Sequence, residues 1–207
     1  MKDLFKGCMT IPNLLSVVRI LLVPVFIYTY LNDDKVLALA ILVLSGLTDF
    51  LDGKIARKFN QISAMGKLLD PVADKFTQLA IAVVLFWQFN SSEVVALKYF
   101  SYVFLGFLGK ELLMLIVGTA MVAVGLRPCA AEIYGKVATF AFYFVMMVVI
   151  CFGPEVGALI DYFVMPNWLL MSLVIISLIL TITAFISYIP DTWRQVKEKY
   201  GKKGETK

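Results

Sequence analysis

Residues 47–76 read LTDFLDGKIARKFNQISAMGKLLDPVADKF and carry four carboxylates, Asp49, Asp52, Asp70 and Asp74, inside or between two long apolar runs. A lone charged side chain near the middle of a membrane-spanning helix costs about 2.5–3.5 kcal/mol on insertion scales. Four such charges need a common partner, so this stretch decides both the fold and the candidate site.

Helical periodicity places these carboxylates on two faces. Residues spaced by three or four positions share a face: Asp49, Asp52, Gly53 and Ala56 on the first helix, and Gly66, Asp70 and Asp74 on the second. The polar segment 57–65 favours a short turn, so the two helices are expected to lie antiparallel with their carboxylates opposed. The pattern predicts a cage made only of oxygen ligands.

An oxygen-only ligand set indicates a hard cation. The chain contains no histidine, and four aspartates suffice for two Mg²⁺ or Mn²⁺ ions that share ligands. Two such ions indicate phosphoryl or diphosphate chemistry. The small residues Gly53, Ala56 and Gly66 let a nucleotide or diphosphate lie against the backbone, and Arg57 is placed to pair with a phosphate.

The same residues carry a family resemblance. Asp49-x2-Asp52-Gly53-x2-Ala56-Arg57-x8-Gly66-x3-Asp70-x3-Asp74 matches every fixed position of the signature of the CDP-alcohol phosphotransferase family. The segments Leu69-Asp70-Pro71-x2-Asp74-Lys75 and Ile11-Pro12-Asn13-Leu14-x-Ser16-x2-Arg19 are similar to the branch that makes phosphatidylglycerophosphate or cardiolipin. The resemblance is strong over the N-terminal half and rests on hydropathy and a few residues beyond it.

The resemblance implies a reaction. A hydroxyl attacks the phosphorus joined to diacylglycerol in CDP-diacylglycerol, and CMP leaves. Asp49, Asp52 and Asp70 are then the principal ligands of two Mg²⁺ or Mn²⁺ ions, while Asp74 is shared between the second ion and general-base catalysis. The CDP-diacylglycerol site would comprise Asp52, Gly53, Ala56, Arg57 and Gly66. Members of the family are commonly homodimers, which is the expectation here.

The acceptor is predicted less directly. Glycerol 3-phosphate needs a cationic pocket, which Arg19, Lys110, Arg127 and Lys136 are placed to line, so phosphatidylglycerophosphate synthase is the first expectation. However, that branch usually carries Arg at the positions of Lys110 and Gly118, and G-K-x-K-T where this chain reads Gly135-Lys136-Val137-Ala138-Thr139. Fewer cations favour a less charged acceptor, such as phosphatidylglycerol in a cardiolipin synthase, and another alcohol stays open.

Composition predicts an all-α membrane protein. The chain is 60% hydrophobic and 16% charged, which is too apolar for a soluble domain. We expect one domain, residues 1–207, with six transmembrane helices in one bundle after a short amphipathic helix at MKDLFKGCMT. Thr10 is expected to cap the first span, with Pro12 in its first turn. The six runs are Asn13–Leu31, Val36–Arg57, Lys67–Phe89, Val94–Val124, Glu132–Phe152 and Asn167–Ile189.

Charge predicts the orientation in the cell membrane. Lys2, Lys6, Lys58, Arg127 and the basic tail 190–207 gather on one side, while the other side holds only two lysines, Lys35 and Lys98. The positive-inside rule therefore places both termini and the carboxylates in the cytoplasm. The tail is typical of a contact with anionic lipid or of a solvated chain end, and nothing around it indicates nucleic-acid binding.

Other readings use the same residues. The aspartates could be buried polar contacts or a proton path. The pair Lys110-Glu111, inside an apolar run, is either functional or an ion pair that fixes helix packing. A membrane prenyltransferase would carry two separated aspartate-rich motifs, and a transporter would show an internal repeat or broken helices. Cys8, Cys129 and Cys151 are isolated, so no zinc site or disulfide framework is predicted.

Overall fold

The computed structural model describes residues 10–59, 66–126 and 133–201. These ranges contain eight helices and no strand. The helices are α1 (Ile11–Leu31), α2 (Lys35–Lys58), α3 (Gly66–Asn90), α4 (Val95–Phe100), α5 (Tyr102–Ala123), α6 (Ile133–Phe152), α7 (Asn167–Ser187) and α8 (Ile189–Gly201).

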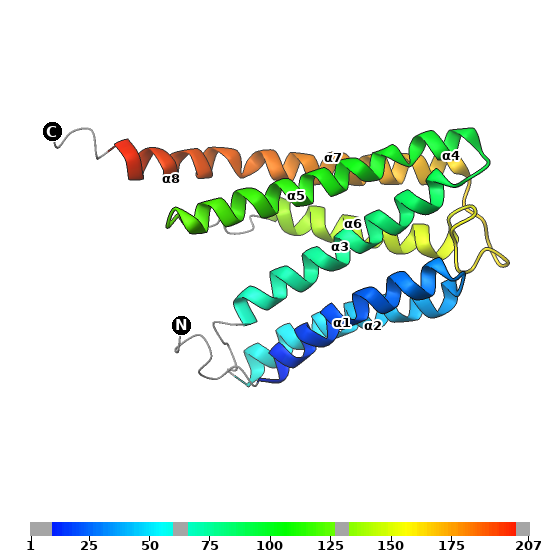
Figure 1. Cartoon of the computed structure of the whole chain (residues 1–207), viewed down its shortest axis with the longest axis horizontal. Coiled ribbons are helices and arrows are strands. Elements are labelled where there is room, and N and C mark those ends of the chain that lie inside the picture. Colours follow the sequence, from blue (N-terminus) through cyan, green and yellow to red (C-terminus); the bar gives the residue numbers. More distant parts are fainter. Residues whose placement is uncertain (1–9, 60–65, 127–132, 202–207) are drawn as a thin grey trace.

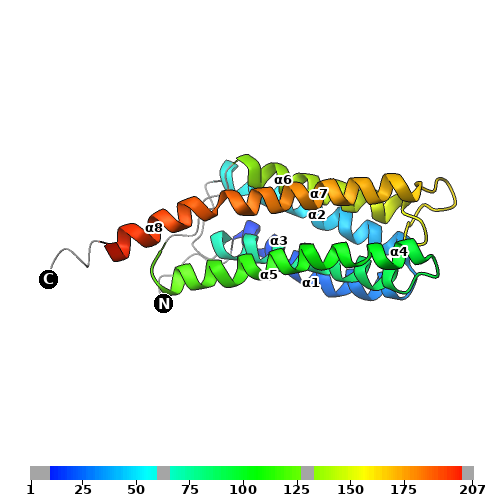
Figure 2. The same cartoon turned by 90° about the horizontal axis from the view of Figure 1, so that it is seen from above.

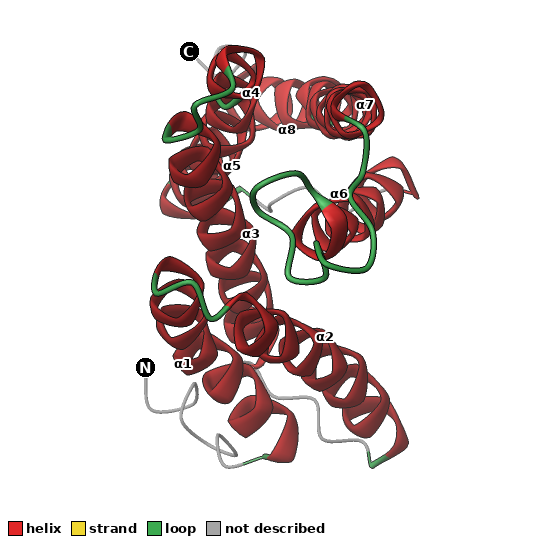
Figure 3. Cartoon of the chain, turned by 90° about the vertical axis from the view of Figure 1, so that its right-hand side faces the viewer, coloured by secondary structure: helices red, strands yellow, loops and turns green. Residues whose placement is uncertain are grey.

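The helices run along one long axis (Figure 1). α1 packs against α2 and α3, α3 also packs against α5, and α7 packs against α5 and α6. Seen from the end, α3 lies between the α1–α2 pair and the helices of the C-terminal half (Figure 3). The C-terminus of α2, the N-terminus of α3 and helix α8 lie at the same end of the bundle, and α8 projects beyond α1, α2 and α3 (Figure 2).

Local signals explain where the first two helices begin. The Thr10 side chain accepts a hydrogen bond from the backbone N–H of Asn13 at 3.4 Å, with Pro12 in the first turn, as the sequence predicts. The Asp34 carboxylate accepts one from the N–H of Leu37 at 3.3 Å and so caps α2. The connection between them is therefore short, and α2 returns antiparallel to α1.

Aromatic residues hold the two halves of the bundle together. The rings of Phe89 in α3 and Phe104 in α5 stack at 5.7 Å, and the Phe107 ring meets the Phe142 ring of α6 edge-on at 5.2 Å. All four side chains are buried. Such contacts add about 0.5–1.5 kcal/mol each beyond their buried area, so they join α3 to α5 and α5 to α6.

The prediction of an all-α membrane fold is confirmed. Within the described residues, four stretches are long and apolar enough to cross a membrane, and they are Ile11–Leu31, Val95–Met121, Tyr134–Phe152 and Asn167–Lys199. α2 and α3, with 24 and 25 residues, also have the length of a span and carry the charges of the candidate site. The fourth predicted run is divided at Ser101, and the expected N-terminal amphipathic helix lies outside the described residues.

Candidate active site

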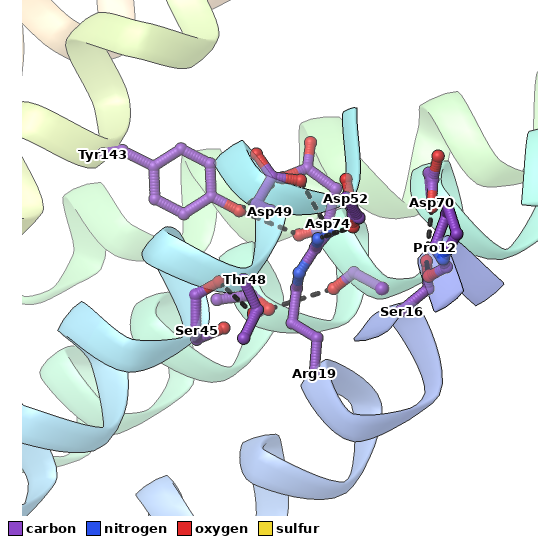
Figure 4. Close-up of polar contacts among 12 residues, drawn as sticks. Pro12, Ser16, Arg19, Ser45, Thr48, Asp49, Asp52, Asp70, Asp74 and Tyr143 are labelled. Atoms are coloured by element: carbon purple, nitrogen blue, oxygen red, sulfur yellow. Dashed lines mark hydrogen bonds and ion pairs between the residues drawn. The ribbon is translucent and has the colours of Figure 1, made fainter. Parts of the chain in front are cut away.

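The four aspartates of the motif lie toward the C-terminus of α2 and near the N-terminus of α3, two helices that both pack against α1. Figure 4 shows Asp49, Asp52 and Asp74 around the guanidinium of Arg19, with Asp70 beside Ser16. α2 and α3 carry two aspartates each, three and four residues apart. One helical turn of spacing therefore directs both members of each pair to the same side.

Arg19 of α1 is the cation at the centre of this cluster. Its Nη1 lies 2.6 Å from Oδ1 of Asp49, and its Nη2 donates a hydrogen bond to Oδ2 of Asp52. Arg19 is 2% exposed and Asp52 is 4% exposed, whereas the side chain of Asp49 is more than half exposed. A buried charge is tolerated only when it is paired, so the Arg19–Asp52 contact requires both partners.

Neutral donors hold the other two carboxylates. The Ser16 hydroxyl contacts Oδ1 of Asp70 and the carbonyl oxygen of Pro12, the latter at 3.1 Å. The Tyr143 hydroxyl of α6 donates to Oδ1 of Asp74 at 2.6 Å. The cluster is thereby tied to α1 and to α6, and each carboxylate already has a partner within the protein.

The donor set of the cluster fits divalent cations. Four carboxylates around one guanidinium leave an excess of three negative charges, and carboxylate oxygens are the ligands that Mg²⁺ and Mn²⁺ favour. In their present conformations, no three such side chains in the described ranges converge on one point. The contacts with Arg19, Ser16 and Tyr143 explain this, because they orient the carboxylates toward protein donors.

A cavity of about 610 Å³ opens beside the carboxylates. Its size is that of cavities that hold small-molecule ligands, roughly 300–1,000 Å³. Anionic and cationic side chains face it from α2, α3 and α6. Its lining consists of Asp49, Asp70, Pro71, Asp74, Lys75, Met114, Gly135, Lys136, Thr139, Phe140, Tyr143 and Tyr188. Three of the four aspartates and two lysines therefore share one chamber.

A second, smaller cavity of about 50 Å³ adjoins the first. Both are lined by Lys75, Met114 and Tyr188, and the smaller one also contacts Lys110 and Glu111 of α5. Glu111 is 5% exposed, and its carboxylate contacts the ammonium groups of Lys75 and Lys110. The lysine and glutamate of the apolar run are thus part of the wall of the candidate site.

A model of the CDP-alcohol phosphatidyltransferase family matches residues 9–183, which include the four aspartates, Arg19, the three lysines and Tyr143 of this site. This chain belongs to that family. Membership agrees with the resemblance of the aspartate motif, and the match continues into α7, in the half of the chain where the sequence resemblance was weak.

Relatives within the family carry two different names. A CDP-diacylglycerol–glycerol-3-phosphate 3-phosphatidyltransferase of Aquifex aeolicus is 35% identical over 87% of this chain and 94% of its own length. A cardiolipin synthase (CMP-forming) of Streptomyces coelicolor is 38% identical over 64% of this chain, which spans only 60% of that relative. The human cardiolipin synthase (CMP-forming) is 52% identical over 35% of this chain and 25% of its own length.

The structure places the other predicted site residues of this family member as follows. Arg19 contacts the carboxylates and is not in the lining of either cavity. Lys136 lines the large cavity, and Lys110 lines the small one. Gly66 begins α3. Gly53, Ala56 and Arg57 lie in the last turns of α2, where only the helix is described, and Arg127 lies outside the described residues.

Four further residues of the site were not predicted from the sequence. They are Ser16, Lys75, Tyr143 and, as a partner of Lys75, Glu111. Two of them had a usable signal. Ser16 and Arg19 are three residues apart, and Lys136 and Tyr143 are seven apart, so each pair shares a helix face. The contact between Lys75 and Glu111 had no local signal, because it depends on how α3 packs against α5.

Proposed function

We propose that this chain transfers a phosphatidyl group from CDP-diacylglycerol to the hydroxyl of glycerol 3-phosphate and releases CMP, a step of phospholipid biosynthesis. The observation that carries the proposal is the cavity of about 610 Å³, in which Asp49, Asp70 and Asp74 face Lys75 and Lys136. Carboxylates for a metal-bound diphosphate and lysines for an acceptor phosphate lie in one chamber. The Aquifex relative, matched over nearly its whole length, carries the name of this reaction.

The donor is proposed to bind at the α2–α3 end of the cavity. The reactive diphosphate would lie beside Asp49, Asp52, Asp70 and Asp74, which would hold two Mg²⁺ or Mn²⁺ ions. Bound divalent cations would neutralise the charge of the diphosphate and of departing CMP. Gly53, Ala56, Arg57 and Gly66 are proposed to contact the nucleotide, as the family motif implies. The aspartates would have to turn from Arg19, Ser16 and Tyr143 to share one ion.

The acceptor is proposed to enter from the side of the lysines. Its hydroxyl oxygen forms a bond to the phosphorus of the phosphatidyl group, and the bond from that phosphorus to the oxygen of CMP breaks. The hydroxyl proton passes to the Asp74 carboxylate, which Tyr143 orients through a 2.6 Å hydrogen bond. The proposed acceptor-binding residues also include Lys110, Lys136 and Arg127. Arg19 belongs to this set only through its contacts with the carboxylates.

The proposed site is cytoplasmic. The end of the bundle that holds the carboxylates also holds Lys54, Lys58, Lys136 and the cations of α8. The other end holds Lys35 and Lys98. An excess of lysine and arginine marks the cytoplasmic side of a membrane protein. CDP-diacylglycerol would then meet a soluble acceptor at the cytoplasmic surface, with a homodimer as the assembly expected from the family resemblance.

An acceptor panel tests the proposal. Purified protein in detergent is given CDP-diacylglycerol, Mg²⁺ or Mn²⁺, and either glycerol 3-phosphate, phosphatidylglycerol, glycerol or inositol. CMP and the lipid product are measured for each acceptor. We expect CMP release that depends on glycerol 3-phosphate, with phosphatidylglycerophosphate as the product. If none of these acceptors supports the release of CMP, the proposed transfer reaction is wrong.

Phosphatidylglycerol is the second candidate acceptor because of an apolar groove. The groove, of about 430 Å³, lies between α5 and α8 and shares Met114 and Tyr188 with the large cavity. Gly118, where the phosphatidylglycerophosphate branch usually carries Arg, lies in its wall. An uncharged groove that borders the reaction chamber would suit an acyl chain of a lipid acceptor, and the Streptomyces relative carries the name of a cardiolipin synthase.

A further inference from the structure

Three charged side chains form a partly buried row between α3 and α5, in which the side chain of Lys75 is 30% exposed. The Glu111 carboxylate lies between two ammonium groups, with Oε2 at 2.5 Å from Nζ of Lys75 and Oε1 in contact with Nζ of Lys110. Glu111 is 5% exposed, and the side chain of Lys110 is 13% exposed. Two ammonium groups that share one carboxylate repel each other, and the carboxylate between them offsets that repulsion.

Of the three side chains in this row, Lys75 is the one that lines the large cavity. Lys75 lines both cavities and directly follows Asp74 in α3, whereas Lys110 and Glu111 line only the smaller one. The row carries one net positive charge, and Lys136 across the large cavity adds a second. A phosphate monoester carries a charge of about −1.5 to −2 near pH 7, so the lysines match this ligand in sign, while the three aspartates of the same cavity are the proposed metal ligands.

We propose that Glu111 is a positioning residue that fixes the ammonium groups of Lys75 and Lys110 as a binding site for the phosphate monoester of the acceptor. The proposal rests on the proposed function, which already assigns Lys75 and Lys110 to the acceptor, and adds the role of Glu111. Lys75 contacts the phosphate, and Glu111 acts through the two lysines. Without the carboxylate, the lysines repel each other and turn away from the chamber, so the site loses its shape although both cations are still present.

Glycerol 3-phosphate binding and turnover with Glu111→Gln test this role. Binding is measured by calorimetry, and turnover by CMP release. We expect the Kd and KM for glycerol 3-phosphate to rise at least about tenfold, as for loss of a charge-assisted contact, with kcat and the KM for CDP-diacylglycerol unchanged. Glu111→Asp keeps the charge and should recover part of the affinity. Glu93→Gln, an exposed carboxylate outside the site, is the matched control and should behave as wild type.

A double-mutant cycle separates positioning from general packing. Lys110→Met alone should weaken glycerol 3-phosphate binding, and adding Glu111→Gln should weaken it by less than Glu111→Gln does in the wild type. Fully additive effects, or an unchanged Kd in Glu111→Gln, would overturn the proposal. If Glu111→Gln does not fold, Lys75→Met decides: unchanged affinity for glycerol 3-phosphate would overturn the role of the lysine pair.

Binding and turnover also separate this inference from the proposed function. A wild-type protein that binds glycerol 3-phosphate but releases no CMP with it refutes the reaction and leaves the phosphate site in place. A wild-type protein that binds no glycerol 3-phosphate refutes the site, whichever acceptor supports turnover.

Discussion

Tyr143 of α6 donates a hydrogen bond of 2.6 Å to the carboxylate of Asp74 in α3, across 69 residues of chain. The same hydroxyl lies 3.2 Å from the main-chain oxygen of Asp74. The bond fixes the orientation of the proposed base and joins the two halves of the bundle at the reaction chamber.

Removing this hydroxyl should lower turnover. Tyr143→Phe keeps the ring and loses the hydrogen bond to a carboxylate, a contact that contributes about 1.5–3 kcal/mol. We expect kcat to fall about tenfold or more with little change in either KM, as measured by initial rates of CMP release. Tyr134→Phe, an exposed tyrosine of the same helix, is the control. Equal loss in both variants would mean that Tyr143 has no special relation to Asp74.

Arg19 should support the cluster rather than the acceptor. Arg19→Lys keeps the charge, but a single ammonium group cannot reproduce the fork that contacts Asp49 and Asp52. We expect a lower melting temperature in detergent and a lower kcat, without a selective rise in the KM for glycerol 3-phosphate. A variant with wild-type stability and a raised KM for that acceptor alone would instead place Arg19 in the acceptor site.

Lys136 should affect the acceptor and not the donor. Its exposed side chain lines the large cavity opposite the carboxylates. Lys136→Ala should raise the KM for glycerol 3-phosphate about ten- to a hundredfold, the cost of one charge-assisted contact, and leave the KM for CDP-diacylglycerol unchanged. Lys197→Ala in α8, outside both cavities, controls for a general loss of positive charge. Wild-type kinetics in Lys136→Ala would mean that this lysine contributes only to the orientation of the protein in the membrane.

Gly118 distinguishes the two acceptor candidates. An added side chain at Gly118 or at Gly109 meets no atom within 4 Å, and the two glycines lie on opposite sides of α5. Gly118→Leu should fill the apolar groove and lower activity with phosphatidylglycerol if that lipid is an acceptor, while activity with glycerol 3-phosphate stays unchanged. Gly109→Leu should change neither. Equal activity of Gly118→Leu and wild type with phosphatidylglycerol would remove the groove from the acceptor question.

Helical periodicity predicted much of the fold and the aspartate pairs. The spacing of Asp49 to Asp52 and of Asp70 to Asp74 is local, so helical periodicity alone predicts that each pair shares a face, whereas the packing of both helices against α1 depends on the fold. The contacts of Tyr143 with Asp74 and of Lys75 with Glu111 join helices far apart in the chain. Helical periodicity predicts which residues share a face of a helix. It does not predict which other helix packs against that face.

The break in the fourth run shows a similar limit. The run Val94–Val124 was predicted as one span because it is long and mostly apolar. In the structure α4 ends at Phe100, and the Ser101 hydroxyl donates to the carbonyl oxygen of Lys98 at 2.6 Å. A serine that bonds to the preceding turn competes with the regular helix pattern. That choice depends on burial of Ser101, which the sequence alone does not reveal.

We propose that the four aspartates form a metal-dependent reaction centre, and the substitution Asp70→Asn tests this role. The substitution keeps the shape of the side chain and removes one charged oxygen ligand. CMP release from CDP-diacylglycerol is measured for the wild type and Asp70→Asn with Mn²⁺, with Mg²⁺ and with EDTA. We predict that EDTA abolishes wild-type turnover and that Asp70→Asn loses about 100-fold or more with either metal, comparable to removal of a key electrostatic stabiliser. Full wild-type turnover in EDTA, or full turnover by Asp70→Asn, would mean that the aspartates hold no metal ion that the reaction needs.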